Sequence, residues 1–267
     1  MSHILVLANS NDKVQESFFP SWVREKLEER GDTVEYGVFT RDEVREKLAG
    51  VDILYSSWGM PVLDDDLLIK ADRLKLVCYT CGSVADFMTE DVVKRGIRLL
   101  CGNRFFAASV AEGTIGYMLM AQRRLKSVVE KTEKEGWTPL TYNEGLRFKT
   151  VGIIGFGMIA KELLRMLPVF GCRIRVCSDW YTEEEAAVYG AEKCSMEELF
   201  STCDIVSLHE SLTTDTRHMI GKQYFDMMKE GALFVNTARG AIIVEEDLAR
   251  AVASGHIRAI LDVYEKL

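Results

Sequence analysis

A glycine-rich turn in the sequence GIIGFGMIA lies between an apolar, strand-like segment and a helical one. Gly155, Gly157 and Ala160 form the pattern GxGxxA in this turn. The first glycine of such a turn allows a tight bend, the second lets the backbone approach a pyrophosphate, and the small third residue allows the strand and the helix to pack closely. The helix that follows offers unpaired N–H groups to the phosphates. We therefore predict a dinucleotide site at this turn.

An acidic residue ends the next strand-like segment. Asp179 follows Gly155 by 24 residues. A carboxylate at that position hydrogen-bonds the adenine-ribose diol of a dinucleotide and repels a 2'-phosphate. The residues after Asp179 are WYT, with no arginine, so we predict NAD rather than NADP. The alternative left open is a methyltransferase, which uses the same strand-end acid to bind S-adenosylmethionine.

An arginine in the motif VNTARG stands directly after a third apolar segment. Arg239 precedes a helical segment that Glu245 and Glu246 open and Gly255 closes. At the carboxyl end of a parallel strand, this guanidinium would face the crevice in which doubly wound sheets bind ligands. Its planar set of donors suits a carboxylate. The structural alternative is an arginine that bridges two domains or caps a helix.

Short apolar segments that alternate with charged helical segments must position these residues. Alternation of this kind predicts parallel strands in doubly wound α/β sheets. At 267 residues and 48% hydrophobic composition, the chain is long enough for two such domains, and we place them at residues 1–102 and 103–267. The predicted strands are 3–8, 33–38, 52–57, 75–80, 97–102, 150–155, 173–178, 204–209, 232–237 and 259–263.

A long helix is predicted between the two series, over residues 109–130. Residues 115–121 are apolar nearly all round, so we expect this helix to be buried on more than one side. Its apolar stripe consists of Val110, Tyr117, Ala121, Leu125 and Val128.

Composition narrows the possible partners. The net charge is −8 and the basic residues are scattered, so we expect no binding to nucleic acid or to anionic lipid. No apolar run is long enough to span a membrane and the N-terminus does not resemble a signal peptide, so we expect a cytoplasmic protein. Seven cysteines in apolar contexts suit buried thiols in a reducing compartment. Cys78 and Cys81 form a CxxC without a second pair, so we predict no metal site.

Five motifs together resemble the NAD-dependent D-isomer-specific 2-hydroxyacid dehydrogenase family. They are SVAE, GIIGFGMIA, VSLHESLTTDTRHMI, VNTARG and SGHIRAILDV, in the order and approximate spacing of the family. The resemblance implies a flavodoxin-like substrate domain at 1–102 and a Rossmann NAD-binding domain at 103–267. It also implies a homodimer packed through the NAD-binding domain, with the helix at 109–130 as the dimer element. The implied reaction is hydride transfer between NAD and a small D-2-hydroxy acid or 2-keto acid.

The resemblance also assigns roles to single residues. Arg239 would be the catalytic residue that holds the carboxylate and keto oxygen of the substrate. The loop CGSVADF would offer backbone N–H groups of Gly82, Ser83 and Val84 to the same carboxylate, unless it is an ordinary strand-to-helix turn. The implied cofactor contacts are Gly155, Gly157, Met158 and Ile159 at the pyrophosphate, Asp179 at the ribose, Thr237 and Ala238 by backbone, Asp262 at the nicotinamide amide, Thr114 beside the nicotinamide, and His209 in the cofactor crevice.

Several positions depart from the family pattern and indicate a divergent subgroup. Ser211 replaces a proline that usually follows the LH motif, and Phe148 stands where a glycine is common. The family's acid/base is a histidine whose pKa is raised by a glutamate. That glutamate is expected about five residues beyond Asp262, at Leu267, and the histidine still further on.

None of the four histidines matches the acid/base motif. They are His3, His209, His218 and His256. The sequence as printed is therefore expected to end before its acid/base pair. A second hypothesis follows, in which the chain is a catalytically silent NAD-binding dimer that senses the cofactor or presents a surface to a partner.

Overall fold

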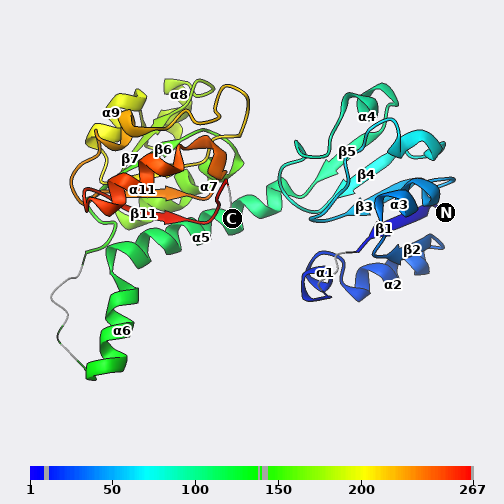
Figure 1. The fold of residues 1–267 in the computed structure, drawn as a ribbon, viewed down its shortest axis with the longest axis horizontal. Helices are drawn as coiled ribbons and strands as arrows, with labels where there is room; N and C mark the ends of the chain where they lie inside the picture. Colours follow the sequence, from blue (N-terminus) through cyan, green and yellow to red (C-terminus); the bar gives the residue numbers. More distant parts are fainter. Residues whose placement is uncertain (9–11, 138, 140–143, 266–267) are drawn as a thin grey trace. The chain divides into compact units, whose positions relative to one another are not determined.

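The computed structural model describes residues 1–8, 12–137, 139 and 144–265. The chain divides into two compact units, Met1–Phe106 (unit 1) and Ala107–Leu267 (unit 2). Each unit is built on one parallel sheet, with helices in the connections between strands (Figure 1). The prediction of two parallel-sheet α/β domains is confirmed.

Unit 1 contains a five-stranded sheet in the order β2-β1-β3-β4-β5, and every pairing is parallel. One core cluster includes Leu5, Leu54 and Val77, and a smaller one, with Ile4 and Val6, packs under the second helix. Alternate residues of β1 thus enter the two clusters, as expected for a strand covered on both faces. The strands are β1 (His3–Leu7), β2 (Thr33–Gly37), β3 (Ile53–Ser56), β4 (Leu76–Tyr79) and β5 (Arg98–Cys101). The helices are α1 (Asp12–Phe18), α2 (Ser21–Glu29), α3 (Arg41–Lys47), η1 (Leu67–Lys70) and α4 (Glu90–Lys94).

Unit 2 contains a six-stranded parallel sheet in the order β11-β10-β9-β6-β7-β8. The first strand of this sheet, β6, pairs with β7 on one side and β9 on the other, so the direction of winding reverses between β6 and β9. The strands are β6 (Thr150–Ile154), β7 (Arg173–Cys177), β8 (Glu192–Lys193), β9 (Ile205–Leu208), β10 (Leu233–Asn236) and β11 (Arg258–Leu261). All ten predicted strands are present, and the two-residue strand β8 is additional.

Helices cover both faces of this sheet. Residues of α5 and α7 share one core cluster with Val151 and Ile153, while residues of α9, α10 and α11 share the other with Ile154. The helices of unit 2 and its entrance are α5 (Asn103–Gln122), α6 (Leu125–Glu135), α7 (Met158–Met166), η2 (Leu167–Phe170), α8 (Glu183–Val188), α9 (Met196–Thr202), α10 (Lys222–Phe225), η3 (Gly240–Ile242) and α11 (Glu245–Ala253).

The single helix predicted over 109–130 is wrong, because the structure has two helices, α5 and α6, that separate at Arg124. Arg124 adopts a left-handed backbone with φ 50°. The N–H of Arg124 donates to Ala121 O at 3.2 Å, and the guanidinium of Arg258 donates to the same oxygen at 3.0 Å, so both bonds satisfy this carbonyl at the helix end. Figure 1 shows α6 projecting away from the body of unit 2.

The predicted burial of this helix on more than one side is also not found in the single chain. One stripe of α5 is buried, whereas Met120 is 39% exposed and α6 has no buried residue. The buried stripe consists of Ala107, Ala111, Thr114, Ile115, Met118 and Gln122. None of the helices in the described part of the chain has the length and apolar character needed to span a bilayer.

Candidate cofactor and substrate site

The residues singled out in the second half of the sequence gather at one edge of the unit 2 sheet. Gly155 follows β6, Asp179 follows β7, His209 follows β9, Thr237 follows β10 and Asp262 follows β11. All these strands are parallel, so their carboxyl ends share one edge. In doubly wound sheets ligands bind at this edge where the winding reverses, here between β6 and β9.

The two glycines of the turn, Gly155 and Gly157, differ in backbone conformation and in the space around them. Gly155 has φ 95°, and a Cβ added to it would lie 2.7 Å from the carbonyl oxygen of His209. Gly157 has φ −76°, and an added Cβ would meet no atom within 4 Å. The fold therefore requires Gly155, whereas Gly157 leaves space free next to the backbone.

The helix α7 begins directly at this space. Gly157 is its N-cap and makes no side-chain cap hydrogen bond, and Met158 and Ile159 are its first residues. The first N–H groups of a helix have no partner within the helix and carry the positive end of its dipole. The turn is thus suited to a pyrophosphate. Asp179 lies exposed beyond the neighbouring strand β7.

A buried asparagine shapes the loop that carries Arg239. Asn236 is fully buried; its Nδ2 donates to Arg239 O at 3.0 Å and its Oδ1 accepts from the N–H of Ala238 at 2.9 Å. Thr237 and Ala238 are nearly buried, while Arg239 is exposed and donates from Nη1 to Ala238 O at 2.7 Å. Asn236 is part of the motif VNTARG, but nothing in the sequence marks it as a structural residue of this loop. Its amide fixes the backbone from which the Arg239 guanidinium projects.

The last described residues cross directly over the turn that follows Arg239. A Cβ on Gly240 would lie 2.1 Å from the carbonyl carbon of Tyr264, so only glycine fits there. Glu265 holds this crossing because its Oε1 accepts from Arg217 at 2.7 Å and its Oε2 pairs with His218 Nε2 at 2.8 Å. The hydrogen bond with His218, together with the charge of Arg217, lowers the pKa of Glu265.

His218 therefore has a structural partner that the sequence did not reveal. Its backbone has φ 52°, and its N–H donates to Ala241 O at 2.9 Å. The expected position of the family glutamate, Leu267, lies outside the described residues.

Helix α5 reaches the same edge of the sheet from one side. Thr114 is fully buried, and its hydroxyl lies 2.7 Å from Val110 O and 3.2 Å from the hydroxyl of Thr237. The position of Thr114 beside the nicotinamide stays a prediction, and its hydroxyl faces Thr237, another residue expected at the cofactor. One turn further along, Tyr117 donates its hydroxyl to Asp262 Oδ1 at 2.8 Å. Tyr117 belongs to the predicted apolar stripe, and its place in the sequence gives no sign of this bond.

His209 lies inside the protein rather than in an open crevice. It is 8% exposed, and its Nε2 lies 2.7 Å from the hydroxyl of Ser207. Burial lowers its pKa to about 3, so the imidazole is neutral at physiological pH. Its carbonyl oxygen packs against Gly155. The backbone of His209 therefore borders the glycine turn, and the role of its ring in the cofactor crevice stays a prediction.

The loop of Gly82, Ser83 and Val84 follows β4 at the carboxyl edge of the unit 1 sheet. All three residues are half-buried. Val84 packs on the unit 1 core, and the hydroxyl of Ser83 accepts from the N–H of Ala85 at 3.3 Å. These contacts of the loop all lie within unit 1.

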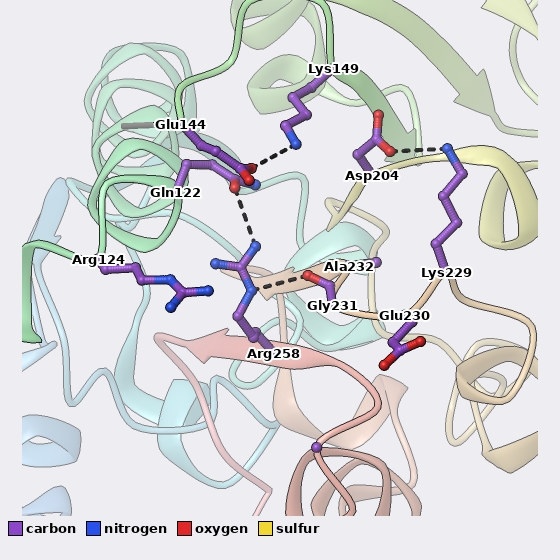
Figure 2. A pocket seen from close by; sticks show the side chains of 11 residues that line it. Gln122, Arg124, Glu144, Lys149, Asp204, Lys229, Glu230, Gly231, Ala232 and Arg258 are labelled. Carbon is purple, nitrogen blue, oxygen red and sulfur yellow. Dashed lines mark hydrogen bonds and ion pairs between the residues drawn. The ribbon is translucent and has the colours of Figure 1, made fainter. Parts of the chain in front are cut away.

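A cavity of about 360 Å³ lies at the opposite edge of the unit 2 sheet, where the strands begin (Figure 2). Glu144 accepts from Lys149 at 2.7 Å, and Asp204 accepts from Lys229 at 2.9 Å. The hydrogen bond from Lys149 lowers the pKa of Glu144. Arg258 bonds Gly231 O and the main chain at the end of α5. These polar groups satisfy one another, and the cavity is remote from the glycine turn.

The cysteines and the acidic residues form no further site in the described part of the chain. All seven cysteines are free, and burial raises the pKa of both Cys78 and Cys81. A reactive CxxC needs a lowered thiol pKa. Among the described residues no cluster of three or more His, Cys, Asp or Glu side chains is arranged to hold a metal ion.

Comparisons with known proteins agree with this geometry. Residues 115–267 match the family model described as D-isomer specific 2-hydroxyacid dehydrogenase, NAD binding domain. D-3-phosphoglycerate dehydrogenase of Methanocaldococcus jannaschii is 32% identical over 90% of this chain and 46% of its own length. Glyoxylate reductase of Thermococcus litoralis is 33% identical over 85% of this chain and 71% of its own length. The chain thus spans less than half of the first relative.

Two solved structures have the same fold as this chain. The TT0316 protein from Thermus thermophilus superposes with a TM-score of 0.82 at 26% identity, covering 99% of this chain and 83% of that protein. D-lactate dehydrogenase from Aquifex aeolicus, complexed with NAD and lactic acid, has a TM-score of 0.77 at 25% identity, covering 98% of this chain and 77% of that protein.

Proposed function

Because this chain belongs to the D-isomer-specific 2-hydroxyacid dehydrogenase family, we propose that it transfers a hydride between NAD and a small D-2-hydroxy acid or its 2-keto acid. The observation that carries the proposal is Arg239, an exposed guanidinium on a fixed backbone at the same sheet edge as the glycine turn. The family assignment leaves the methyltransferase alternative without support.

The cofactor is NAD, and we assign its contacts to unit 2. The N–H groups of Met158 and Ile159 would bind the pyrophosphate above Gly157, and Asp179 would accept from the adenine-ribose hydroxyls. Nearer the nicotinamide, the backbone of Thr237 and Ala238 would border the ring, and Asp262 would accept from its carboxamide. Thr114 acts in this scheme by holding Thr237.

Arg239 would hold the substrate. Its five N–H donors can bind a carboxylate through two parallel hydrogen bonds, and the same fork can reach the keto oxygen. In the structure Nη1 donates to Ala238 O, so binding a substrate would exchange this neutral acceptor for a charged one. The bound nicotinamide supplies or accepts the hydride. Arg239 would orient the keto carbon toward it.

Reduction also adds a proton to the keto oxygen, and in this proposal that proton would come from the acid/base histidine that the family pattern expects beyond Leu267, not from His209. An imidazole whose pKa is about 3 carries no extra proton at neutral pH. Its buried ring instead supports the strand end beneath the glycine turn. We also propose residues 1–102 as the substrate domain, in which the loop of Gly82, Ser83 and Val84 offers its N–H groups to the carboxylate.

The test is NADH oxidation with glyoxylate, hydroxypyruvate and pyruvate, comparing the wild-type chain with Arg239→Gln. Losing a bidentate, charge-assisted contact of about 3 kcal/mol should lower kcat/KM by about 100-fold. NADH affinity should stay the same, because the proposal assigns Arg239 to the substrate and not to the dinucleotide. Arg250→Gln is the matched control, since Arg250 lies exposed on α11 and pairs only locally with Asp247.

Two outcomes would contradict the proposal. Full turnover by the Arg239→Gln variant would show that this residue does not bind the substrate. Tight NADH binding by the wild-type protein, without oxidation in the presence of any 2-keto acid, would favour the silent NAD-binding dimer.

We further propose a homodimer formed through α5 and α6 of unit 2. Leu125 and Val129 lie one turn apart on α6 and are 46% and 53% exposed. Helix α6 has no buried residue in its own chain, so this exposed apolar pair is suited to pack against a second copy of the protein. A monomeric mass in light scattering would refute this assembly.

The seven free thiols favour a reducing, cytoplasmic location.

A further inference from the structure

The hydrogen bond between Tyr117 and Asp262 joins a helix to the end of the last strand of unit 2. The hydroxyl of Tyr117 donates to Asp262 Oδ1 at 2.8 Å. Asp262 is exposed, and its own N–H donates to Asn236 O at 3.0 Å. The backbone of Asp262 is thus fixed by the sheet, and Tyr117 fixes its side chain. The bond also raises the pKa of Tyr117, so the phenol remains a donor at physiological pH.

Tyr117 does not act alone on this edge. Thr114 lies three residues before it on α5, and residues with this spacing lie on the same side of a helix. The Thr114 hydroxyl reaches Thr237, at the end of β10, at 3.2 Å. One side of α5 therefore holds two neighbouring strand ends, both of which carry residues assigned to the nicotinamide half of the cofactor.

We propose that Tyr117 is a positioning residue for the cofactor, which holds the Asp262 carboxylate so that its second oxygen, Oδ2, can accept from the nicotinamide carboxamide. This inference rests on the proposed contact of Asp262 with NAD. An exposed carboxylate otherwise samples several rotamers, and binding must then restrict it. A group that is already oriented before binding avoids this cost.

The experiment measures the dissociation constants of NADH and of ADP-ribose for the wild-type protein and for Tyr117→Phe. Binding must then restrict a freed Asp262 side chain, which should weaken the affinity for NADH by about 3- to 10-fold. ADP-ribose lacks the nicotinamide, so its affinity should not change. Tyr224→Phe is the matched control, because Tyr224 packs against Phe200 in the other core cluster.

A double-mutant cycle separates this inference from the role of Asp262 itself. Asp262→Ala should weaken NADH but not ADP-ribose, and adding Tyr117→Phe to it should cause no further loss. If Asp262→Ala weakens NADH while Tyr117→Phe does not, positioning by Tyr117 is refuted. If Tyr117→Phe weakens both ligands equally, its role is only structural and the inference also fails. If Asp262→Ala changes neither affinity, the proposed contact of Asp262 is wrong, and the inference falls with it.

Discussion

Replacing Gly157 by alanine should remove most of the affinity for NADH with little loss of stability. The backbone of Gly157 has φ −76°, which any residue adopts, and an added Cβ meets no atom within 4 Å. Alanine is a poorer helix N-cap than glycine, so we expect the free energy of unfolding to fall by no more than about 1 kcal/mol. The new methyl group would occupy the space through which a pyrophosphate approaches the backbone. Losing one or two charge-assisted hydrogen bonds costs about 3 kcal/mol, or about 100-fold in Kd.

Gly155→Ala is the matched comparison, because it should damage the fold first. A left-handed backbone costs a residue with a side chain about 1–2 kcal/mol. The added Cβ would also lie 2.7 Å from His209 O, a main-chain atom that cannot rotate away. Overpacking of this kind costs about 1–3 kcal/mol more. The total of about 2–5 kcal/mol corresponds to a Tm lowered by roughly 5–15 °C in a domain of this size.

Thermal unfolding by circular dichroism and titration with NADH, followed by its fluorescence, measure both effects. We expect Gly157→Ala to have nearly the wild-type Tm and weak NADH binding, and Gly155→Ala to have a low Tm. If Gly157→Ala binds NADH like the wild type, the pyrophosphate does not approach this turn. If the two variants lose stability equally, the division of roles between the two glycines is wrong.

Two further predictions concern stability. Phe148 is 77% exposed and its backbone has φ 67°. Phe148→Gly should relieve about 1–2 kcal/mol of backbone strain and lose about 0.5 kcal/mol of cation–π contact with Arg147. We therefore expect the Tm to rise by a few degrees. An unchanged or lower Tm would contradict this. Burial holds the pKa of His209 near 3 in the folded protein, whereas the histidine of the unfolded chain takes up a proton below about pH 6.5. The stability that comes from the neutral His209 is therefore complete above about pH 6.5. It declines toward pH 3 by up to about 1.4 kcal/mol per pH unit. Urea unfolding between pH 7 and pH 4 should show a shallower loss for His209→Gln, and an equal slope would refute the reasoning.

Local patterns in the sequence determined most of the fold and the identity of the cofactor. Each predicted strand is a short apolar segment between polar helical segments, and this alternation predicts parallel sheets. The turn at Gly155 and Gly157 and the acid at Asp179 are spaced by the geometry of one βαβ unit, which a sequence can show directly. The family resemblance and the prediction of NAD are confirmed for this reason.

Contacts between distant residues were decided only by the tertiary structure. The helix predicted as one piece ends near Gln122, where Arg258, 137 residues after Ala121, donates to the Ala121 carbonyl. Tyr117 was interpreted as an apolar residue of a helix stripe, because its partner Asp262 lies 145 residues away.

The environment of single side chains was likewise beyond the sequence. The departure at Phe148 was visible, but only the backbone dihedral explains why a glycine suits that position. His209 was predicted in the cofactor crevice, but only the packed structure shows that its ring is 8% exposed and that burial keeps it neutral. Burial and hydrogen-bond partners depend on how elements pack, and no local pattern encodes them.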